Sequence, residues 1–433
     1  MSDSSTCLID GFGPLPVARP SSVAEVGDLV RRAAAPLTLP SPPSGGRGEG
    51  EKGQAIYPLG GGTMLDLGLP PTRPGRAIDL RRLDAVIDYP ARDLTVTVQA
   101  GITLAKLQAL LATENQRLPI DVPHAEQATL GGALAANVSG PRRYGFGTLR
   151  DYVIGISIVN DEGQEVKAGG RVVKNVAGYD LCKLYVGSLG TLGIITQVTL
   201  KLRPLPEEQA LLALPCPPEK LEELLDRLHG SRTRPVCIDL LNAAAAAVLN
   251  RQAVGLLPEA PWLVLVGFED NRASVAWQTQ QLAQEVPAGA GTAQGAYAPR
   301  SAFLWQALAE FKARSEAWFC FKANLLPHAV AGFCQKAAAM LPGLLLQAHA
   351  GNGIVIGQVD SDLSIDEANR LLGELHEAAG EAGNVIVTRC PPAWKPHLPV
   401  WGKPRGDAWL MRQVKDKLDP RRLFNPGRFL DGM

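Results

Sequence analysis

The sequence has no excess of one charge, no membrane-spanning or secretory segment and no paired cysteines, and each absence argues against a class of protein. Lys+Arg and Asp+Glu balance at 43 each, so the total charge favours neither nucleic acid nor an anionic membrane surface as a partner. No apolar run is long and unbroken enough for a membrane span, and residues 1–13 lack the basic and apolar regions of a secretory signal. The seven cysteines are dispersed without a Cys-x-x-Cys pair, which favours reduced thiols in the cytoplasm and argues against an iron–sulfur cluster on this chain.

The chain has 433 residues, which is enough for two or three domains. Hydrophobic residues make up 46% of it, an ordinary composition for a globular protein. Residues 36–54 are rich in Pro, Ser and Gly and show no apolar periodicity, which predicts a flexible, solvated insertion. Short strands and glycine-rich turns dominate up to about residue 205. From there to residue 388, helices alternate with single strands, which predicts an α+β cap on one antiparallel sheet.

Two glycine-rich stretches give the main functional signal. Residues 58–63 read Pro-Leu-Gly-Gly-Gly-Thr directly after a short strand, and residues 129–132 read Thr-Leu-Gly-Gly. Glycines leave backbone N–H groups unobstructed, and such groups can surround an anion. The pair predicts one extended ligand, such as a dinucleotide pyrophosphate, held from two sides. Two ordinary tight turns are the alternative.

A third run, residues 187–193, holds three further glycines. No Gly-x-Gly-x-x-Gly opens a helix after a first strand with an acidic residue some twenty positions later, so the sequence does not predict a Rossmann site. Binding is expected to depend on loops.

Taken in order, these stretches resemble the PCMH-type FAD-binding domain of the vanillyl-alcohol oxidase superfamily. The residues that carry the resemblance are 58–63, 98–101, 129–132 with Asn137 and Gly140, 178–180 and 187–195. Within that superfamily, residues 174–181, residues 424–428 and the general layout resemble the E subunits of bacterial glycolate oxidases. The resemblance implies an α+β fold with a two-subdomain FAD-binding domain at 1–205, a cap at 206–388 and a C-terminal segment, 389–433, that returns to the FAD-binding domain.

The resemblance also implies which residues contact FAD. The 60–62 loop is expected to receive the pyrophosphate with help from the Thr63 hydroxyl, residues 187–193 to approach the ribityl chain or ring, and Ile195 to pair with the adenine edge. The full set of expected cofactor-binding residues is Pro58, Gly60, Gly61, Gly62, Thr63, Gly101, Thr129, Gly131, Gly132, Asn137, Gly140, Tyr179, Asp180, Gly187, Ser188, Gly190, Thr191, Gly193, Ile195 and Asn425.

Some of these positions have a second interpretation. Residues 178–180 could start a helix with Asp180 as its N-cap, and residues 425–427 are a good turn sequence in their own right. The FAD is expected to be non-covalent, because Leu59, Met64, Leu65 and Asp66 beside the loop cannot form a flavin bond.

Catalytic residues are not assigned by the sequence, and no metal is expected. The related flavin D-2-hydroxyacid dehydrogenases place paired histidines in the cap, often with a metal, but none of the six histidines here forms such a pair. His349 resembles a fragment of that motif, although a lone strand histidine is more often structural. Lys322 lies in an apolar strand, 319–324, and could face an anionic ligand or the flavin; solvent exposure or a structural ion pair is favoured slightly.

The resemblance implies an FAD-binding subunit of a glycolate oxidase complex, which oxidises glycolate to glyoxylate. The expected partners are a sister D-type flavin subunit and an iron–sulfur F-type subunit, with any membrane contact made through those partners. A self-sufficient D-lactate-type dehydrogenase and a non-catalytic assembly subunit are the alternatives. Residues 391–401, with Trp394 and Trp401, are predicted either to dock a partner or to pack on this chain's own flavin domain.

Overall fold

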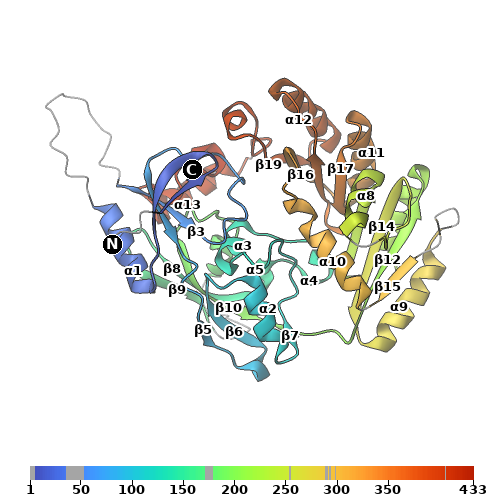
Figure 1. Ribbon diagram of the computed structural model, residues 1–433, viewed down its shortest axis with the longest axis horizontal. Helices are drawn as coiled ribbons and strands as arrows, with labels where there is room; N and C mark the ends of the chain where they lie inside the picture. The colour runs from blue at the N-terminus through green and yellow to red at the C-terminus, as the bar shows by residue number, and fades with distance from the viewer. Residues whose placement is uncertain are drawn as a thin grey trace.

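The computed structural model describes residues 5–35, 53–170, 179–252, 255–287, 291, 294–297, 299–404 and 406–433. Most of the predicted insertion at 36–54 and residues 174–178 of the glycolate oxidase-like motif lie outside these ranges. Two halves are visible in Figure 1, with the N-terminal strands on the left and the helix-covered cap sheet on the right.

The first sheet of the N-terminal half delivers the chain to the first glycine loop. Its strand order is β1-β2-β4-β3, and β3 runs parallel to β4. Helix α1 packs beside it and begins after Ser22, whose side chain accepts a hydrogen bond from the Glu25 N–H. The bounds are β1 Thr6–Ile9, β2 Phe12–Ala18, α1 Val23–Ala34, β3 Ala55–Leu59 and β4 Gly75–Asp79.

The second sheet is antiparallel, with the order β5-β6-β10-β8-β9. A separate two-stranded pair, β7 with β11, closes one end. The bounds are β5 Val86–Asp88, η1 Ala91–Asp93, β6 Thr95–Gln99, α2 Leu104–Ala112, β7 Gln116–Arg117, α3 Leu130–Ala136, α4 Arg143–Phe146, α5 Leu149–Tyr152, β8 Val153–Val159, β9 Glu165–Gly169, α6 Cys182–Tyr185, β10 Ile194–Lys201 and β11 Arg203–Pro204.

The cap is built on one eight-stranded antiparallel sheet, as predicted. Its strand order is β15-β12-β14-β13-β17-β18-β16-β19. The strand bounds are β12 Glu208–Cys216, β13 Cys237–Asn242, β14 Trp262–Asp270, β15 Gln294–Tyr297, β16 Phe319–Asn324, β17 Leu345–His349, β18 Ile354–Val359 and β19 Asn384–Arg389. The short edge strand β15 was not predicted.

Helices cover both faces of the cap sheet. Helices α7, α9, α11 and α12 share an apolar core with one face, while α8 and α10 share a second core with the face turned towards the N-terminal half. The bounds are η2 Pro218–Lys220, α7 Leu221–His229, α8 Ala243–Gln252, α9 Arg272–Glu285, α10 Arg300–Glu310, η3 Phe311–Ala313, η4 Pro327–Ala329, α11 Val330–Met340, η5 Ala350–Asn352 and α12 Ile365–Ala379.

The C-terminal segment crosses back to the first sheet, where Figure 1 shows α13 beside β3. Phe424 forms a parallel bridge with Ile56, so the returning chain extends that sheet's edge locally. Its elements are η6 Pro392–His397, α13 Ala408–Leu418 and η7 Leu430–Gly432. Within the ranges that the structure describes, no helix is both long and apolar enough to cross a membrane.

The two tryptophans of the 391–401 segment pack on this chain. The Trp401 ring stands edge-on to Phe429, with the centroids 5.1 Å apart, and Trp394 is partly buried against the cap core. Trp394 therefore packs on the cap and not on the flavin domain, so the arrangement in which both tryptophans pack on the flavin domain was wrong for Trp394, and docking of a partner on this segment stays a prediction.

A buried charge cluster joins the two halves. Arg142 of the N-terminal half lies 2.5 Å from Asp121 and 2.6 Å from Glu269 of β14, and its guanidinium stacks over the Trp305 ring at 4.0 Å. Arg117 adds a second contact to Glu269, at 2.5 Å. Desolvated charge pairs of this kind are costly to break, so the cluster holds the cap in a fixed position over the N-terminal half.

Candidate functional site

The first glycine loop fits only residues without side chains. A Cβ at Gly60 would lie 2.1 Å from Thr129 Oγ1, and a Cβ at Gly61 would lie 1.8 Å from the Gln127 carbonyl oxygen. Gly62 has a φ of +74°, which L side chains rarely adopt. Strand β3 therefore ends in a loop that passes unusually close to the segment before α3.

The N–H groups of this loop are available to a ligand. In the described part of the chain, no carbonyl or side chain accepts a hydrogen bond from the N–H of residues 60 to 63. Backbone N–H groups are nearly always satisfied in folded proteins. The predicted ribbon of donors is therefore present and free to meet an anion.

The second glycine stretch differs from the prediction. It is the start of helix α3 rather than a free turn, and Thr129 is its N-cap. The Gly131 N–H donates to the Ala100 carbonyl at 2.7 Å, and the Gly132 N–H donates to Thr129 Oγ1 at 3.3 Å. This stretch was expected to present free N–H donors to the ligand, as the first loop does. That expectation was wrong, because these N–H groups already donate to the Ala100 carbonyl and to the capping Thr129 side chain. What it contributes is a surface without side chains.

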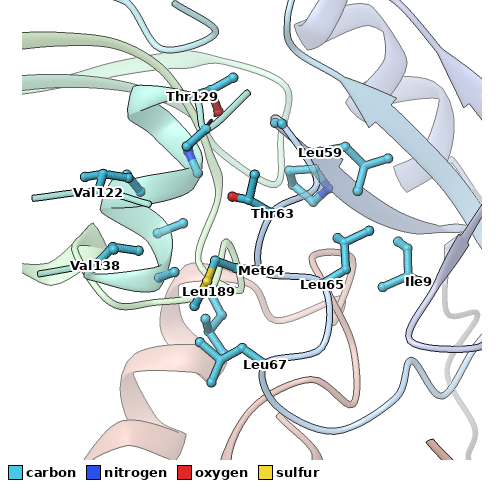
Figure 2. Close-up of a pocket in the computed structure, with 18 of the residues that line it drawn as sticks. Ile9, Leu59, Thr63, Met64, Leu65, Leu67, Val122, Thr129, Val138 and Leu189 are labelled. Atoms are coloured by element: carbon cyan, nitrogen blue, oxygen red, sulfur yellow. Dashed lines mark hydrogen bonds between the residues drawn. The ribbon is translucent and has the colours of Figure 1, made fainter. Parts of the chain in front are cut away.

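A cavity lies between the loop and α3, and the space inside its lining, open solvent included, is about 780 Å³. Figure 2 shows Thr63 and Met64 on the loop side and Val122 and Val138 on the opposite side. Apolar side chains dominate the lining, and Asn425 and Arg428 add polar groups from the C-terminal segment. Such a cavity suits a flat apolar ring attached to a charged tail.

A second cavity, of about 430 Å³, continues from the first towards the third glycine run. The two cavities share residues of the loop, of α3 and of the C-terminal segment. Asn425 donates its amide to the Leu189 carbonyl at 2.6 Å, which brings the third run against the loop. The predicted cofactor-binding residues that line one or both cavities are Pro58, Gly60, Gly61, Thr63, Thr129, Gly131, Gly132, Gly190, Gly193, Ile195 and Asn425.

The other predicted residues lie apart from these two cavities. Gly62 lines the neighbouring interdomain cleft, and Gly101 and Gly140 permit close packing against Leu80 and Asp121. Asn137 ends α3 in a left-handed conformation. Gly187 has a φ of +80°, the Ser188 hydroxyl donates to the Tyr185 carbonyl of α6, and the Thr191 hydroxyl donates to the Ser188 carbonyl. A cofactor contact from any of these stays a prediction.

Tyr179 and Asp180 are placed at the surface. The Tyr179 side chain is 93% exposed, and Asp180 forms an exposed ion pair with Lys183 at 3.1 Å. The N-cap of α6 is Leu181, so Asp180 is not the helix cap that was considered for it.

Three charged residues that sequence reasoning missed hold the loop in place. Arg428 donates to the carbonyls of Leu65, Leu67 and Leu69, at 2.6 to 2.8 Å. Lys395 donates to the Gly68 carbonyl at 2.9 Å and to Asp10 at 2.7 Å. Burial raises the pKa of Asp10 and lowers that of Lys395, while their mutual attraction opposes both changes.

A larger interdomain cleft opens beside the loop. It holds about 1390 Å³ of empty space and is lined by residues of the loop, of α10 and of the segment 313–316. The His124 backbone N–H donates to the Glu310 carboxylate at 2.9 Å, and the Arg389 guanidinium donates to the Asp66 carboxylate at 2.9 Å. Through this cleft the loop is accessible to a ligand from the cap side.

His349 is held by a buried carboxylate. Its Nδ1 lies 2.8 Å from Asp239 Oδ1, and Gln347 donates to the other carboxylate oxygen at 2.8 Å. Nε2 is buried and has no partner in the described ranges. With Nδ1 donating to the carboxylate, Nε2 is left as an acceptor. Tyr144 of α4 packs over the adjoining residue Gly351.

Lys322 forms no ion pair and no hydrogen bond within the described ranges. The structural ion pair favoured for it from the sequence is therefore absent there. Its side chain is partly buried on β16, and burial together with the charge of Arg143 lowers its pKa.

The residues present fit an FAD. Free N–H groups suit a pyrophosphate, the bare glycine surfaces permit close approach, and the apolar lining suits a flavin ring. In the described residues, no group of three or more His, Cys, Asp or Glu side chains could hold a metal ion.

Comparisons with known proteins agree with this fit. Residues 49–169 match the model of an FAD binding domain. The chain is 29% identical to the glycolate oxidase subunit GlcD of Bacillus subtilis over 395 residues, which is 86% of this chain and 83% of that one. It is 40% identical to the glycolate oxidase subunit GlcE of Escherichia coli over 148 residues, 34% of this chain and 42% of that one. A D-lactate dehydrogenase of Archaeoglobus fulgidus is 35% identical over 167 residues, 39% of this chain and 37% of that one.

Among solved structures, a 4-ethylphenol oxidase of Gulosibacter chungangensis superposes with a TM-score of 0.69. The match covers 95% of this chain and 88% of that one at 14% sequence identity. At this identity the likeness concerns the fold alone; together with the match of residues 49–169 to an FAD binding domain, it confirms the predicted α+β architecture with a PCMH-type FAD-binding fold.

Proposed function

We propose that this FAD-dependent oxidoreductase, whose FAD binding domain spans residues 49–169, is the FAD-binding subunit of a glycolate oxidase complex. The observation that carries the proposal is the loop of free N–H groups facing α3 across an apolar cavity, on a chain whose relatives are named glycolate oxidase subunits. The domain bounds 1–205, 206–388 and 389–433 belong to the same proposal.

The chain's own residues would divide the work of holding the cofactor. The N–H groups of residues 60–63 would bind the pyrophosphate, while Met64, Val122 and Val138 would keep water from the ring. When bound, FAD supplies the acceptor for the hydride that leaves the hydroxyl-bearing carbon of a 2-hydroxy acid. Lys395 and Arg428 would act only by fixing the loop.

Electrons are proposed to leave through other chains. Iron–sulfur clusters need grouped thiolates, and the seven cysteines of this chain are dispersed. A sister D-type subunit would carry the oxidation of glycolate, and an iron–sulfur F-type subunit would accept the electrons.

One observation favours a second candidate, a self-sufficient dehydrogenase of the D-lactate type. The oxidation needs a base for the hydroxyl proton, and His349 Nε2 is an acceptor held in orientation by Asp239. A D-lactate dehydrogenase is also among the relatives.

Anaerobic absorption spectra of the purified chain test both candidates. We expect a flavin spectrum that glycolate bleaches only after the D-type sister subunit is added. Bleaching of the isolated chain by D-lactate or glycolate, but not by L-lactate, would establish the second candidate instead. A chain without flavin that also fails to take up added FAD would refute both.

A further inference from the structure

The third glycine run carries backbone donors that no group of the described chain uses. In the described ranges, no carbonyl or side chain accepts a hydrogen bond from the N–H of Gly190 or of Leu192. Both residues are buried, and Gly190 lines the second cavity. Buried N–H groups are nearly always paired in folded proteins. The two free donors therefore indicate that a ligand supplies their acceptors.

A buried lysine of α13 holds the peptide group that lies between these two residues. The Lys415 ammonium donates to the Thr191 carbonyl at 2.6 Å and to the Phe424 carbonyl at 3.0 Å. Its third partner is the Asp419 carboxylate, at 2.6 Å. These acceptors use all three N–H bonds of an ammonium group. Lys415 lines neither cavity, so it acts on a ligand there only through the glycine run.

The planarity of a peptide group connects this lysine to one of the free donors. The Thr191 carbonyl and the Leu192 N–H belong to the same trans peptide unit, so they point in opposite directions. With the carbonyl fixed on the lysine, the Leu192 N–H faces away from the ammonium group. Asn425 acts in the same way on the Leu189 carbonyl, and hence on the Gly190 N–H. Two side chains of the C-terminal segment therefore orient both free donors.

We propose that Lys415 is a positioning residue for the adenosine diphosphate half of FAD. The apolar lining of the first cavity suits the flavin ring, and Gly60 of the first glycine loop lines both cavities. The second cavity is then left for the adenosine end, beside the free donors of the third run. The inference concerns the cofactor alone, so it does not depend on which acid the protein oxidises or on its partner chains.

Calorimetric titrations of the cofactor-free chain with the two halves of FAD test the proposal. Lys415→Met keeps the apolar length of the side chain and removes its donors. We expect ADP to bind about 10-fold to 100-fold more weakly, because a charged hydrogen bond that orients the run is lost. FMN, which carries the flavin ring, is expected to bind as it does to the unmodified chain. Lys417→Met changes an exposed lysine of α13 and should alter neither affinity.

Asp419→Asn separates this role from a purely structural one. It breaks the buried ion pair but leaves the Lys415 amine able to donate to the Thr191 carbonyl. Thermal unfolding without cofactor should show a lower midpoint in both Asp419→Asn and Lys415→Met, because each leaves one buried group without its partner. We expect ADP affinity to fall in Lys415→Met alone, and an equal loss in Asp419→Asn would overturn the proposal.

The double variant keeps the test decisive where a single variant is too unstable to purify. Lys415→Met combined with Asp419→Asn removes both buried charges, so the unfolding midpoint should recover while ADP affinity stays low. ADP affinity that recovers together with the midpoint would overturn the proposal. Equal losses of ADP and FMN binding in Lys415→Met, unchanged ADP binding in that variant, or an unmodified chain that binds FAD but not ADP would overturn it as well.

Discussion

Replacing Gly132 by Ala separates the cofactor role of α3 from its structural role. Gly132 lies within the helix and lines both cavities. Outside the helix's own backbone, a Cβ there would have one neighbour within 4 Å, Thr129 Oγ1 at 3.1 Å. The added methyl group therefore enters space that the cofactor is expected to fill.

The two consequences have opposite signs. Without cofactor, Ala lowers the conformational entropy of the unfolded chain, which stabilises the protein by about 0.4–1 kcal/mol. With cofactor, an extra methyl group in a close-packed contact costs about 1–3 kcal/mol. This corresponds to FAD binding that is about 5-fold to 140-fold weaker. Gly132→Val adds two more methyl groups and is expected to abolish binding.

Titration of FAD into the apoprotein, followed by flavin fluorescence, measures the affinity, and thermal unfolding of the apoprotein measures the stability. Gly332→Ala on α11 is the matched control, because a Cβ there meets nothing within 4 Å. It is expected to show the same gain in stability with unchanged FAD affinity. Unmodified affinity in both Gly132→Ala and Gly132→Val would refute the placement of the cofactor against α3.

Three further outcomes are expected. Acid denaturation should release all flavin into the supernatant, because no cysteine or histidine lies among the described residues that line the two cavities; colour retained in the pellet would show a covalent bond. Arg142→Leu leaves Asp121 and Glu269 without their shared partner, so denaturant unfolding should show a loss of about 3–5 kcal/mol, and an unchanged unfolding free energy would contradict the role of the cluster. Lys312 has a pKa of about 7 in the folded chain against 10.5 unfolded, so the unfolded chain binds more protons between these values and the unfolding free energy should rise with pH from about 7 to 10.5. Lys312→Met should flatten that rise, and an equal slope in both proteins would contradict the lowered pKa.

Features with a local cause could be predicted from the sequence. The apolar run before the first glycine loop indicated the short strand that is β3, and Thr103 is of a residue type that favours the cap position it takes before the helix beginning at Leu104. The same capping pattern, a threonine directly before an apolar residue, is present at Thr129. It was interpreted as an anion-accepting turn because glycines leave N–H groups unobstructed. Glycines are also poor helix formers, but the fold overrides that weak preference and begins α3 there.

Features with distant partners could not be predicted in this way. Asp10, Lys395 and Arg428 are each ordinary charged residues in sequence, and only the return of the C-terminal segment brings them together under the loop. The edge strand β15 lacks an apolar alternation, and its pairing to β12 alone defines it. The Asp239–His349 pair likewise follows from strand order, since β13 and β17 become neighbours across the sheet.

The hold of Arg428 on the loop has a consequence for biosynthesis. The carbonyls of Leu65 and Leu67 find their donor in a residue more than 360 positions later in the chain. While the ribosome is still translating the cap, those carbonyls have no partner and the loop cannot take its final shape. Cofactor capture must therefore follow translation of the C-terminal segment, and a nascent chain arrested before residue 428 will emerge without flavin.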